Sequence, residues 1–391
     1  MSNVLPASSP ITLRSIDSIA HVSAQHWDRC ANADGLDNPF VCHAFLSAME
    51  QSGSAAAKSG WGPAHLLAED DSGTLLGCAP LYLKSHSYGE YVFDWSWAEA
   101  WEKAGGHYYP KLQCAVPFTP ATGPRLLISP TAPAPDAVAA NLLQGMIGLG
   151  RRLKLSSAHI TFPTASQCHL AEQQGWMPRM GQQFHWTNPG YASFDDFLAA
   201  LSSRKRKSIR KERDRAQSLG LTFHCLTGSD LKSQHWDAFY DFYLGTVEKK
   251  WAHAYLTRDF FDLLGQTMAD KVVLMMAAQD GRWVAGALNL LGKDCLFGRN
   301  WGAVGDFPFL HFELCYYRAM DFAIERGLPR IEAGAQGEHK VARGYLPTPT
   351  WSAHWINNPG FARAVGNFLN QERAAVEQAM EALSLESPYR Q

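Results

Sequence analysis

The sequence predicts an α+β protein made of two similar halves. Two hairpin patterns carry this prediction, because at residues 65–83 and 272–291 two apolar runs flank a polar turn that contains glycine. A Trp-Asp pair opens a helical region ahead of each hairpin, at residues 27–28 and 236–237. Helix and hairpin therefore recur in the same order, which indicates an internal duplication.

The spacing of these features supports the duplication. The Trp-Asp pairs lie 236 − 27 = 209 residues apart, and Gly77 and Gly286, inside the second strands, lie 286 − 77 = 209 apart. Chance agreement of common residues is the alternative. A chain of 391 residues, 46% of them hydrophobic, is long enough for two cores. With the turn-rich stretch Trp186–Ala192 as boundary, we expect superposable domains over residues 10–188 and 189–391 with a cleft between them.

In the first half, a helix is expected over residues 43–50, before the hairpin. The stretch from Trp95 to Arg125 is dense in tryptophan, tyrosine, proline and glycine, which predicts an irregular, rigid loop wall instead of a regular helix or strand. Such walls often line sites, and core packing under long loops is the alternative. The candidate site residues of this wall are Trp95, Trp97, Tyr108, Tyr109, Lys111 and Arg125.

The second half opens on helix signals. Ser193 is a predicted N-cap and Asp196 lies in an acidic first turn, and the apolar face that follows is interrupted near Ser202 and Ser203. Basic residues then concentrate at Arg204, Lys205, Arg206, Lys207 and Lys211. In a chain of net charge −2, phosphate or RNA contact is the functional interpretation, and a solvated helix face is the alternative.

A predicted helix spans residues 310–326, where apolar side chains recur at i, i+4, i+7 and i+11 before a glycine and a proline stop it. A short strand follows and breaks at Gly334 and Gly337. Glycines there let backbone amides approach an oxyanion or a phosphate. The last predicted helix, over residues 361–383, carries an apolar stripe and belongs to the core.

Three ionisable residues follow the second glycine. Glu338, His339 and Lys340 supply an acid or base, a group that titrates near neutrality, and a cation. A solvated turn with a Glu–Lys pair is the alternative. His311 and Glu313 lie near the start of the preceding helix, where they either face the same site or hydrogen-bond locally.

Composition and motifs argue against several classes of protein. Thirty-five basic against 37 acidic residues create no global field for DNA or an anionic membrane. The eight cysteines form no C-x-x-C pair, so we expect a reduced, cytoplasmic chain without a metal site. We find no signal-peptide pattern and no apolar run near 18 residues, and therefore expect no membrane span. The G-x-S-x-G, H-E-x-x-H and P-loop motifs are absent.

The chain resembles the FemAB-like group of bacterial proteins, which is placed in the GNAT acyltransferase superfamily and is linked to peptidoglycan biosynthesis or recognition. The resemblance runs from about Trp27 to Leu383 and rests on the segments Trp95–Trp97, Tyr108–Leu112, Pro117–Pro120 with Gly123–Arg125, Arg204–Arg213, Leu310–Tyr316 and Glu332–Lys340. It implies tandem GNAT-like domains that transfer an acyl or aminoacyl group to an amine, with no tightly bound cofactor.

In the Fem enzymes that the chain resembles, the donor is aminoacyl-tRNA, the acceptor is the stem peptide of a cell-wall precursor, and a lysine assists the transfer. Lys340 matches that lysine, although Arg343 replaces an aromatic residue of the pattern and His339 precedes the lysine. The long helical arm that Fem enzymes use for tRNA has only the basic stretch 204–215 in its place.

Acetyl-CoA or another acyl-CoA is the alternative donor. Residues 299–304 come close to the pyrophosphate-binding pattern [QR]-x-x-G-x-[GA], but Val304 stands where a small residue is expected. On the resemblance, the loop-wall residues are the candidates for binding the acceptor. The donor candidates are Arg299, Gly302, Gly334, Gln336 and Gly337, together with Arg204, Lys205, Arg206, Lys207 and Lys211.

The favoured function is that of an acyltransferase. Glu338 or His339 takes a proton from the bound amine, and Lys340 with nearby backbone amides stabilises the oxyanion. The expected partners are a small-molecule or peptide amine and, where it is the donor, tRNA. One alternative is an acetyl-CoA-dependent N-acetyltransferase of small molecules. The other is a non-catalytic module that binds cell-wall fragments or RNA.

Overall fold

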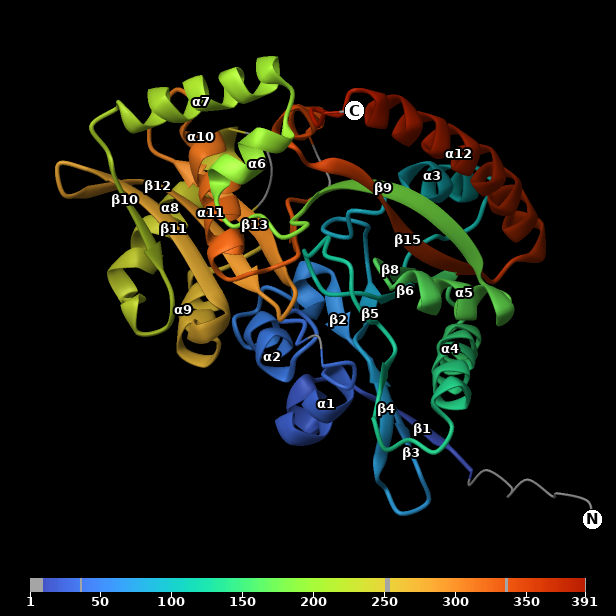
Figure 1. Cartoon of the computed structure of the whole chain (residues 1–391). Helices are drawn as coiled ribbons and strands as arrows, with labels where there is room; N and C mark the ends of the chain where they lie inside the picture. The colour runs from blue at the N-terminus through green and yellow to red at the C-terminus, as the bar shows by residue number, and fades with distance from the viewer. Residues whose placement is uncertain (1–9, 36, 250–253, 335–336, 391) are drawn as a thin grey trace, which may run out of the picture. The chain divides into compact units, whose positions relative to one another are not determined.

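The computed structural model describes residues 10–35, 37–249, 254–334 and 337–390 (Figure 1). The chain divides into two compact units. The first comprises Met1–Glu50, Ala55–Met180 and Trp351–Gln371, and the second comprises Gln51–Ser54, Gly181–Thr350 and Glu372–Gln391. The sequence ranges 10–188 and 189–391 are continuous, whereas the structure assigns Trp351–Gln371 to the first unit.

The first unit contains two runs of strands. Its four-stranded sheet is antiparallel, in the order β1-β3-β4-β7, with β1 at Thr12–Ile16, β3 at His65–Glu69, β4 at Leu75–Ala79 and β7 at Leu127–Ile128. A second run follows the order β15-β8-β6-β5-β2, with β2 at Trp61–Pro63, β5 at Leu81–Lys84, β6 at Lys111–Cys114 and β8 at Ser157–Thr161.

Helices cover the four-stranded sheet of the first unit. Helix α4 (Pro135–Arg152) packs against β3 and β4, and α1 (Ala24–Ala31) packs against β4 and β7 (Figure 1). The other helices of this unit are α2 (His43–Gln51), α3 (Trp95–Lys103) and α5 (Ala165–Gln173). The core between α4 and the strands is apolar, with Leu142, Leu143 and Met146 fully buried, so hydrophobic burial is the main source of its stability.

The second unit repeats the order of elements found in the first. The repeated part follows two helices, α6 (Phe194–Ala200) and α7 (Ser203–Gln217). It begins with β10 (Thr222–Leu226), continues through α8 (Ser233–Lys249) and α9 (Arg258–Thr267), and then forms the strands β11 (Val272–Gln279), β12 (Arg282–Leu291) and β13 (Cys295–Ala303). A helix, the strand β14 (Arg330–Glu332) and a short helical turn complete it before β15 (Leu346–Ile356). Both predicted hairpins are confirmed, as β3–β4 and β11–β12.

The repeated order confirms the duplication, but the equal spacing of the two glycines is not an exact residue match. Trp27 and Trp236 are each the fourth residue of their helices and are buried. Gly77 faces Val138 of α4, whereas Gly286 faces Phe239 of α8. The two glycines thus lie in corresponding strands but meet different helices. Alternation of faces along a strand means that a shift of one residue is enough to produce this difference.

The last strand of each sequence half pairs with the last-but-one strand of the other half. Ser352–Ile356 of β15 pairs with β8, and the end of β9 (Met177–Thr187) pairs with β14 through residues 185–187. This exchange explains why the segment after Trp351 belongs to the first unit. Helix α12 (Pro359–Leu385) then follows β15. The prediction that its apolar stripe belongs to the core is confirmed only in part, because Val365 and Leu369 are buried whereas Phe368 and Ala379 of the same stripe are exposed.

One prediction from the aromatic stretch is wrong. Residues Trp95–Lys103 form helix α3, and residues 111–114 form β6, so this stretch is not entirely irregular. The nine residues of α3 include two alanines, two glutamates and a lysine and contain neither proline nor glycine, and such a segment favours a helix whatever its tryptophan content. Residues 104–110 and 115–125 contain no assigned helix or strand.

The helix signals at the start of the second half are confirmed. Ser193 Oγ accepts a hydrogen bond from the Asp196 amide at 3.2 Å, which caps α6 (Phe194–Ala200). The interruption near Ser202 separates α6 from α7 (Ser203–Gln217). The predicted helix over 310–326 is also present, as α10 (Leu310–Phe312), a π-helical turn (Glu313–Tyr317) and α11 (Arg318–Glu325). Among the described residues, no helix combines the length and apolar character needed to cross a bilayer.

Gly302 provides a test of the packing of α8 on β13. A Cβ on this residue would lie 2.1 Å from the carbonyl oxygen of Phe242, which belongs to the α8 backbone. We expect Gly302→Ala to lower the free energy of unfolding by about 1–3 kcal/mol, because one of the two elements must shift. Gly298→Ala in the same strand is the control, since its nearest neighbour is 3.5 Å away. Equal urea midpoints for the two variants would contradict the assignment.

Candidate functional site

The sequence-predicted turn around Lys340 follows directly on β14. Gly334 and Gly337 have φ angles of +77° and +105°, which only glycine adopts without strain. A 3₁₀ helix, Glu338–Arg343, continues the chain and buries Lys340. The Lys340 Nζ atom donates to the carbonyl oxygens of Ala333 at 2.6 Å and Gly334 at 2.9 Å. Since an ammonium group has three hydrogens and the described part of the chain supplies these two acceptors, one hydrogen is left for a ligand.

Burial lowers the pKa of Lys340 to about 8. Removing an ammonium group from water disfavours its charged form. The group therefore remains mostly protonated at pH 7, yet lies in a poorly solvated position where its attraction for a developing negative charge is strong. These are the properties expected of an oxyanion donor.

His339 lies beside Lys340 and contacts the preceding helix. Its Nε2 atom is 3.0 Å from the hydroxyl oxygen of Tyr316, which belongs to the π-helical turn. Burial, followed by the charges of Arg343 and Lys340, lowers the pKa of His339, so the imidazole is neutral at pH 7 and able to accept a proton. Burial raises the pKa of Tyr316, which keeps its hydroxyl protonated. π-Helical turns occur often at functional sites.

Helix α7 holds this turn in place from its inward face. Arg343 forms two hydrogen bonds with Glu212, at 3.0 and 3.1 Å, and donates to the His339 carbonyl oxygen at 2.7 Å. Its guanidinium lies 3.4 Å from the ring centroid of Phe312. Bidentate pairing of this kind fixes geometry as well as charge. Arg343, which replaces an aromatic residue of the Fem pattern, thus links α7 to the Lys340 turn.

Glu313 and His311 lie near the same turn but have different surroundings. Glu313 is fully buried and forms ion pairs with Arg213 at 3.2 Å and Arg318 at 3.1 Å, so its charge is already balanced. The His311 ring packs 5.3 Å from Trp301 and 6.1 Å from His339, centroid to centroid. Among the described residues, His311 thus lies beside His339 of the Lys340 turn, whereas Glu313 pairs with the two arginines.

The donor candidates are dispersed over several elements. Arg299 and Gly302 lie inside β13 and not at a strand-to-helix turn, and Gly302 is occupied by its contact with α8. The donor candidate Gln336 falls outside the described residues, and so does the side chain of the catalytic candidate Glu338. On α7, Arg204, Lys207 and Lys211 are exposed, while Lys205 and Arg206 are partly buried. Their contact with a donor stays a prediction.

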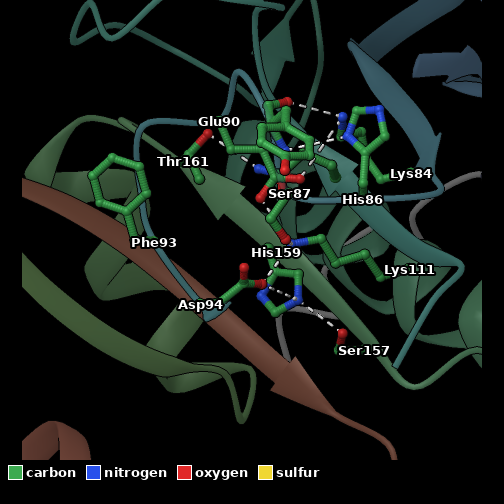
Figure 2. A network of polar contacts seen from close by, with 12 residues as sticks. Lys84, His86, Ser87, Glu90, Phe93, Asp94, Lys111, Ser157, His159 and Thr161 are labelled. Carbon is green, nitrogen blue, oxygen red and sulfur yellow. Dashed lines mark hydrogen bonds and ion pairs between the residues drawn. The ribbon is translucent and has the colours of Figure 1, made fainter. Parts of the chain in front are cut away.

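A second constellation lies in the first unit, where Lys111 is fully buried. Its Nζ atom donates to Ser87 Oγ at 2.8 Å, Glu90 Oε2 at 2.7 Å and Asp94 Oδ2 at 2.5 Å (Figure 2). All three ammonium hydrogens are therefore used. Although burial opposes it, the attraction of Glu90 and Asp94 raises the pKa of Lys111. We call the group Lys84, Ser87, Glu90, Asp94, Tyr108, Lys111, His159 and His354 the Lys111 network.

Two histidines extend the Lys111 network across paired strands. His159 of β8 and His354 of β15 are register partners, and their Nδ1 atoms are 2.8 Å apart. Burial lowers the pKa of His159 to about 3 and also lowers that of His354, so both rings are neutral and share one hydrogen between the two nitrogens. The Tyr108 hydroxyl donates to Asp94 at 2.7 Å and lies 3.3 Å from His159 Nε2.

The structure brings some of the predicted loop-wall residues together. Tyr108 and Lys111 belong to the network, and the Tyr109 hydroxyl is 2.8 Å from Ser87 Oγ. Trp97 is buried beside His354, whereas Trp95 is exposed and contacts Tyr88. Arg125 has another role, because its guanidinium donates to the carbonyl oxygens of Ala121, Gly123, Pro124 and Thr161 and so holds its own loop.

Sequence reasoning missed six polar members of the network, namely Lys84, Ser87, Glu90, Asp94, His159 and His354. One signal was available, because the tripeptide Ser-Ala-His occurs at both 157–159 and 352–354. In a strand, the serine and histidine of this tripeptide point to one face. Two copies in paired strands would therefore place both histidines together. Among the described residues, no group of three or more His, Cys, Asp or Glu side chains could hold a metal ion.

Residues 18–391 match the model of the FemAB-like family, which is described as acting in peptidoglycan biosynthesis or recognition. The chain belongs to the FemAB-like family. This confirms the resemblance inferred from the sequence, and membership indicates acyltransferase activity. No curated protein sequence matches the chain.

Solved structures share the fold of this FemAB-like protein. FemX is 11% identical, with a TM-score of 0.54, and the match covers 90% of this chain and 100% of FemX. The C-terminal domain of a putative lysylphosphatidylglycerol synthetase from Agrobacterium fabrum is 11% identical, with a TM-score of 0.55 and coverage of 90% and 97%. A conserved protein of unknown function from Bacteroides thetaiotaomicron is 10% identical, with a TM-score of 0.51 and coverage of 88% and 99%. At such identities the likeness concerns the fold, and it confirms the predicted α+β class.

Proposed function

We propose that this FemAB-like protein transfers an aminoacyl or acyl group to an amine, and that the Lys340 turn performs the transfer. One observation carries the proposal. The Lys340 ammonium is buried, bound to two backbone carbonyls with one hydrogen to spare, and adjacent in sequence to a neutral imidazole. A cation that stabilises an oxyanion and a base that accepts the amine proton are the two groups that such a transfer requires.

The reaction follows from these two groups. The acceptor amine attacks the carbonyl carbon of an ester or thioester donor, and a C–N bond forms while the carbonyl oxygen gains negative charge. The third Lys340 hydrogen binds this oxygen. His339 Nδ1 takes the proton that the amine loses, while Nε2–H donates to the hydroxyl oxygen of Tyr316 at 3.0 Å and so orients the ring. The C–O or C–S bond to the leaving group then breaks, and the proton held on His339 passes to that group.

The family and one structural neighbour suggest the biosynthetic process in which the reaction takes part. The family is described by peptidoglycan biosynthesis or recognition, and one neighbour is named a putative lysylphosphatidylglycerol synthetase. We therefore propose a role in the biosynthesis of peptidoglycan or of a related lipid, with a peptide or small-molecule amine as acceptor. A cytoplasmic location is part of the proposal, because aminoacyl-tRNA and acyl-CoA donors are made there.

Both candidate donors carry phosphate groups, and the exposed basic residues of α7 favour a polyanionic one. Arg204, Lys207 and Lys211 are exposed in a chain of net charge −2, so they create a local positive field that the whole chain lacks. Aminoacyl-tRNA would use several such contacts, whereas an acyl-CoA would use fewer, and affinity for tRNA would fall steeply with salt.

A donor panel tests the proposal. The purified chain is incubated with aminoacyl-tRNA, acetyl-CoA or longer acyl-CoAs and a mixture of peptide and small amines, and new amides are detected by mass spectrometry. We expect one donor class to give an amide, and thermal stabilisation of about 2.7 kcal/mol when that donor is present at about 100 times its dissociation constant. A donor that binds without any transfer would favour a non-catalytic module, and no binding by any donor would overturn the proposal.

A further inference from the structure

Two lysines of the Lys111 network lie directly opposite each other. Lys84 of β5 and Lys111 of β6 are register partners in antiparallel strands, and both side chains are fully buried. Like charges at opposite positions repel, and burial strengthens the repulsion. Such a pair does not stabilise a core by itself. The two cations must therefore be neutralised, either by anionic groups of the chain or by a bound anionic ligand.

One segment of the chain supplies all the neutralising groups. Ser87, Glu90 and Asp94 lie in the connection between β5 and β6, residues 85–110, which we call the β5–β6 excursion. The corresponding connection in the second unit, between β12 and β13, is only residues 292–294. The excursion is thus an addition to the repeated fold, and it covers the two lysines with its own carboxylates (Figure 2).

The two carboxylates of the excursion are held very differently. Asp94 precedes α3, and its Oδ2 atom accepts hydrogen bonds from both Lys111 and the Tyr108 hydroxyl. The Oε2 atom of Glu90 accepts one hydrogen bond, from Lys111, and Oε1 lies 4.0 Å from Lys84 Nζ. Each carboxylate also has one buried oxygen without a hydrogen bond, which is unfavourable, but Asp94 is held by two donors and Glu90 by one. Glu90 is therefore the weaker of the two contacts.

Lys84 is also incompletely satisfied. Its Nζ atom donates to the Tyr88 carbonyl oxygen at 3.2 Å and lies 3.7 Å from the ring centroid of Trp61. Burial lowers the pKa of Lys84 to about 7 and raises that of Glu90 to about 7, so neither charge is strongly stabilised by the other. A group that could bind both Lys84 and Lys111 closely would be favoured over Glu90.

We propose that Lys84 and Lys111 form a binding site for a carboxylate group of the acceptor substrate, and that Glu90 occupies this site in the free protein. This inference rests on the proposed function only in calling the ligand the acceptor. A carboxylate fits better than a phosphate dianion because it replaces Glu90 charge for charge. The formal charges of the two lysines, Asp94 and one monoanion add up to zero, whereas a dianion would leave a net negative charge buried.

The outer side of the excursion offers surface for the rest of such a ligand. Tyr88 and Phe93 are 60% and 56% exposed, and Trp95 is 39% exposed. The rings of Tyr88 and Trp95 are in edge contact, with centroids 4.9 Å apart. Exposed rings in the same ten residues as Glu90 would contact the ligand once its carboxylate had displaced that side chain.

Binding of small probes to the full-length chain tests the proposal without any transfer reaction. At pH 7, where Lys84 is still partly protonated, N-acetylglycine supplies one carboxylate, N-acetylglycinamide is its neutral counterpart, and methyl phosphate is mostly a dianion. We expect N-acetylglycine to bind more tightly than the other two. Glu90→Gln should tighten its binding about tenfold, because a competing charge is removed, and Lys84→Met should abolish the preference for the carboxylate over the amide.

The control is Glu99→Gln, which removes an exposed carboxylate of the same excursion, paired only with Lys103; it should leave binding unchanged. If the ion network only stabilises the fold, Glu90→Gln should weaken the binding of N-acetylglycine or leave it unchanged. That result in a folded variant, or tighter binding of methyl phosphate than of N-acetylglycine, would overturn the proposal. If Glu90→Gln does not fold, the three probes are compared on the unaltered protein and on Lys84→Met. The proposal then requires that the unaltered protein prefer N-acetylglycine and that Lys84→Met lose this preference. If the probes bind as expected but the donor panel gives no amide, the carboxylate site is supported and the proposed transfer reaction is not.

Discussion

Lys111→Met is expected to lower the free energy of unfolding by about 3–5 kcal/mol, the range found when one partner of a buried ion pair is removed. The variant would leave Glu90 and Asp94 buried without their shared cation and Ser87 without its donor. Methionine fills much of the space of the lysine side chain, so lost charge pairing and not lost volume causes the effect. Urea unfolding of the variant and the unaltered chain measures it.

Two further variants separate charge from packing in the Lys111 network. Lys103→Met is the control, because Lys103 is exposed and its pair with Glu99 is worth little. The triple variant Lys111→Met, Glu90→Gln, Asp94→Asn removes the unpaired charges and should recover part of the lost stability. A loss below about 1 kcal/mol for Lys111→Met would mean that water reaches the site and that the carboxylates are not desolvated.

Lys340→Ala is expected to lower kcat by about 10²–10³-fold while changing the KM for the acceptor little. The removal of one oxyanion-hole donor typically has this effect, because the interaction is made in the transition state. Steady-state kinetics with the donor identified by the panel provide the measurement. Lys293→Ala, an exposed lysine in the turn before β13, is the matched control. A rise in KM with unchanged kcat would instead assign Lys340 to ground-state binding.

The fold was largely accessible from the sequence because its signals are local. Alternating apolar runs around Gly-containing turns predict both hairpins, and Ser193 predicts a helix start that its hydrogen bond to Asp196 confirms. The exchange of β9 and β15 was not predicted, since local patterns do not specify a pairing partner so far away in the chain; the repeated Ser-Ala-His of β8 and β15 is the one mark of it described above. Helix α3 contradicts the predicted loop, because the absence of proline and glycine from residues 95–103 favours a helix despite the three tryptophans.

The two sites differ in how much of them the sequence shows. The Lys340 turn is continuous in the chain, so its glycines, imidazole and ammonium could be seen together. The Lys111 network is assembled from β5, β6, β8, β15 and the excursion, and its two lysines become partners only through strand register. Buried charges of this kind look like ordinary surface residues in a sequence. Only burial shows that Lys84, Glu90 and Asp94 need partners.

The pH dependence of kcat/KM, compared between the unaltered protein and Lys340→Arg, tests the central claim most directly. Because burial lowers the pKa of Lys340 to about 8, the oxyanion donor loses its proton as the pH rises through 8, and the rate should fall there. Arginine stays protonated throughout, so Lys340→Arg, although slower, should show no such fall. The acceptor amine titrates equally in both reactions and cancels in the ratio. A ratio of the two rates that changes near pH 8 is the result we predict, and a ratio that is constant from pH 6 to 10 would contradict the account.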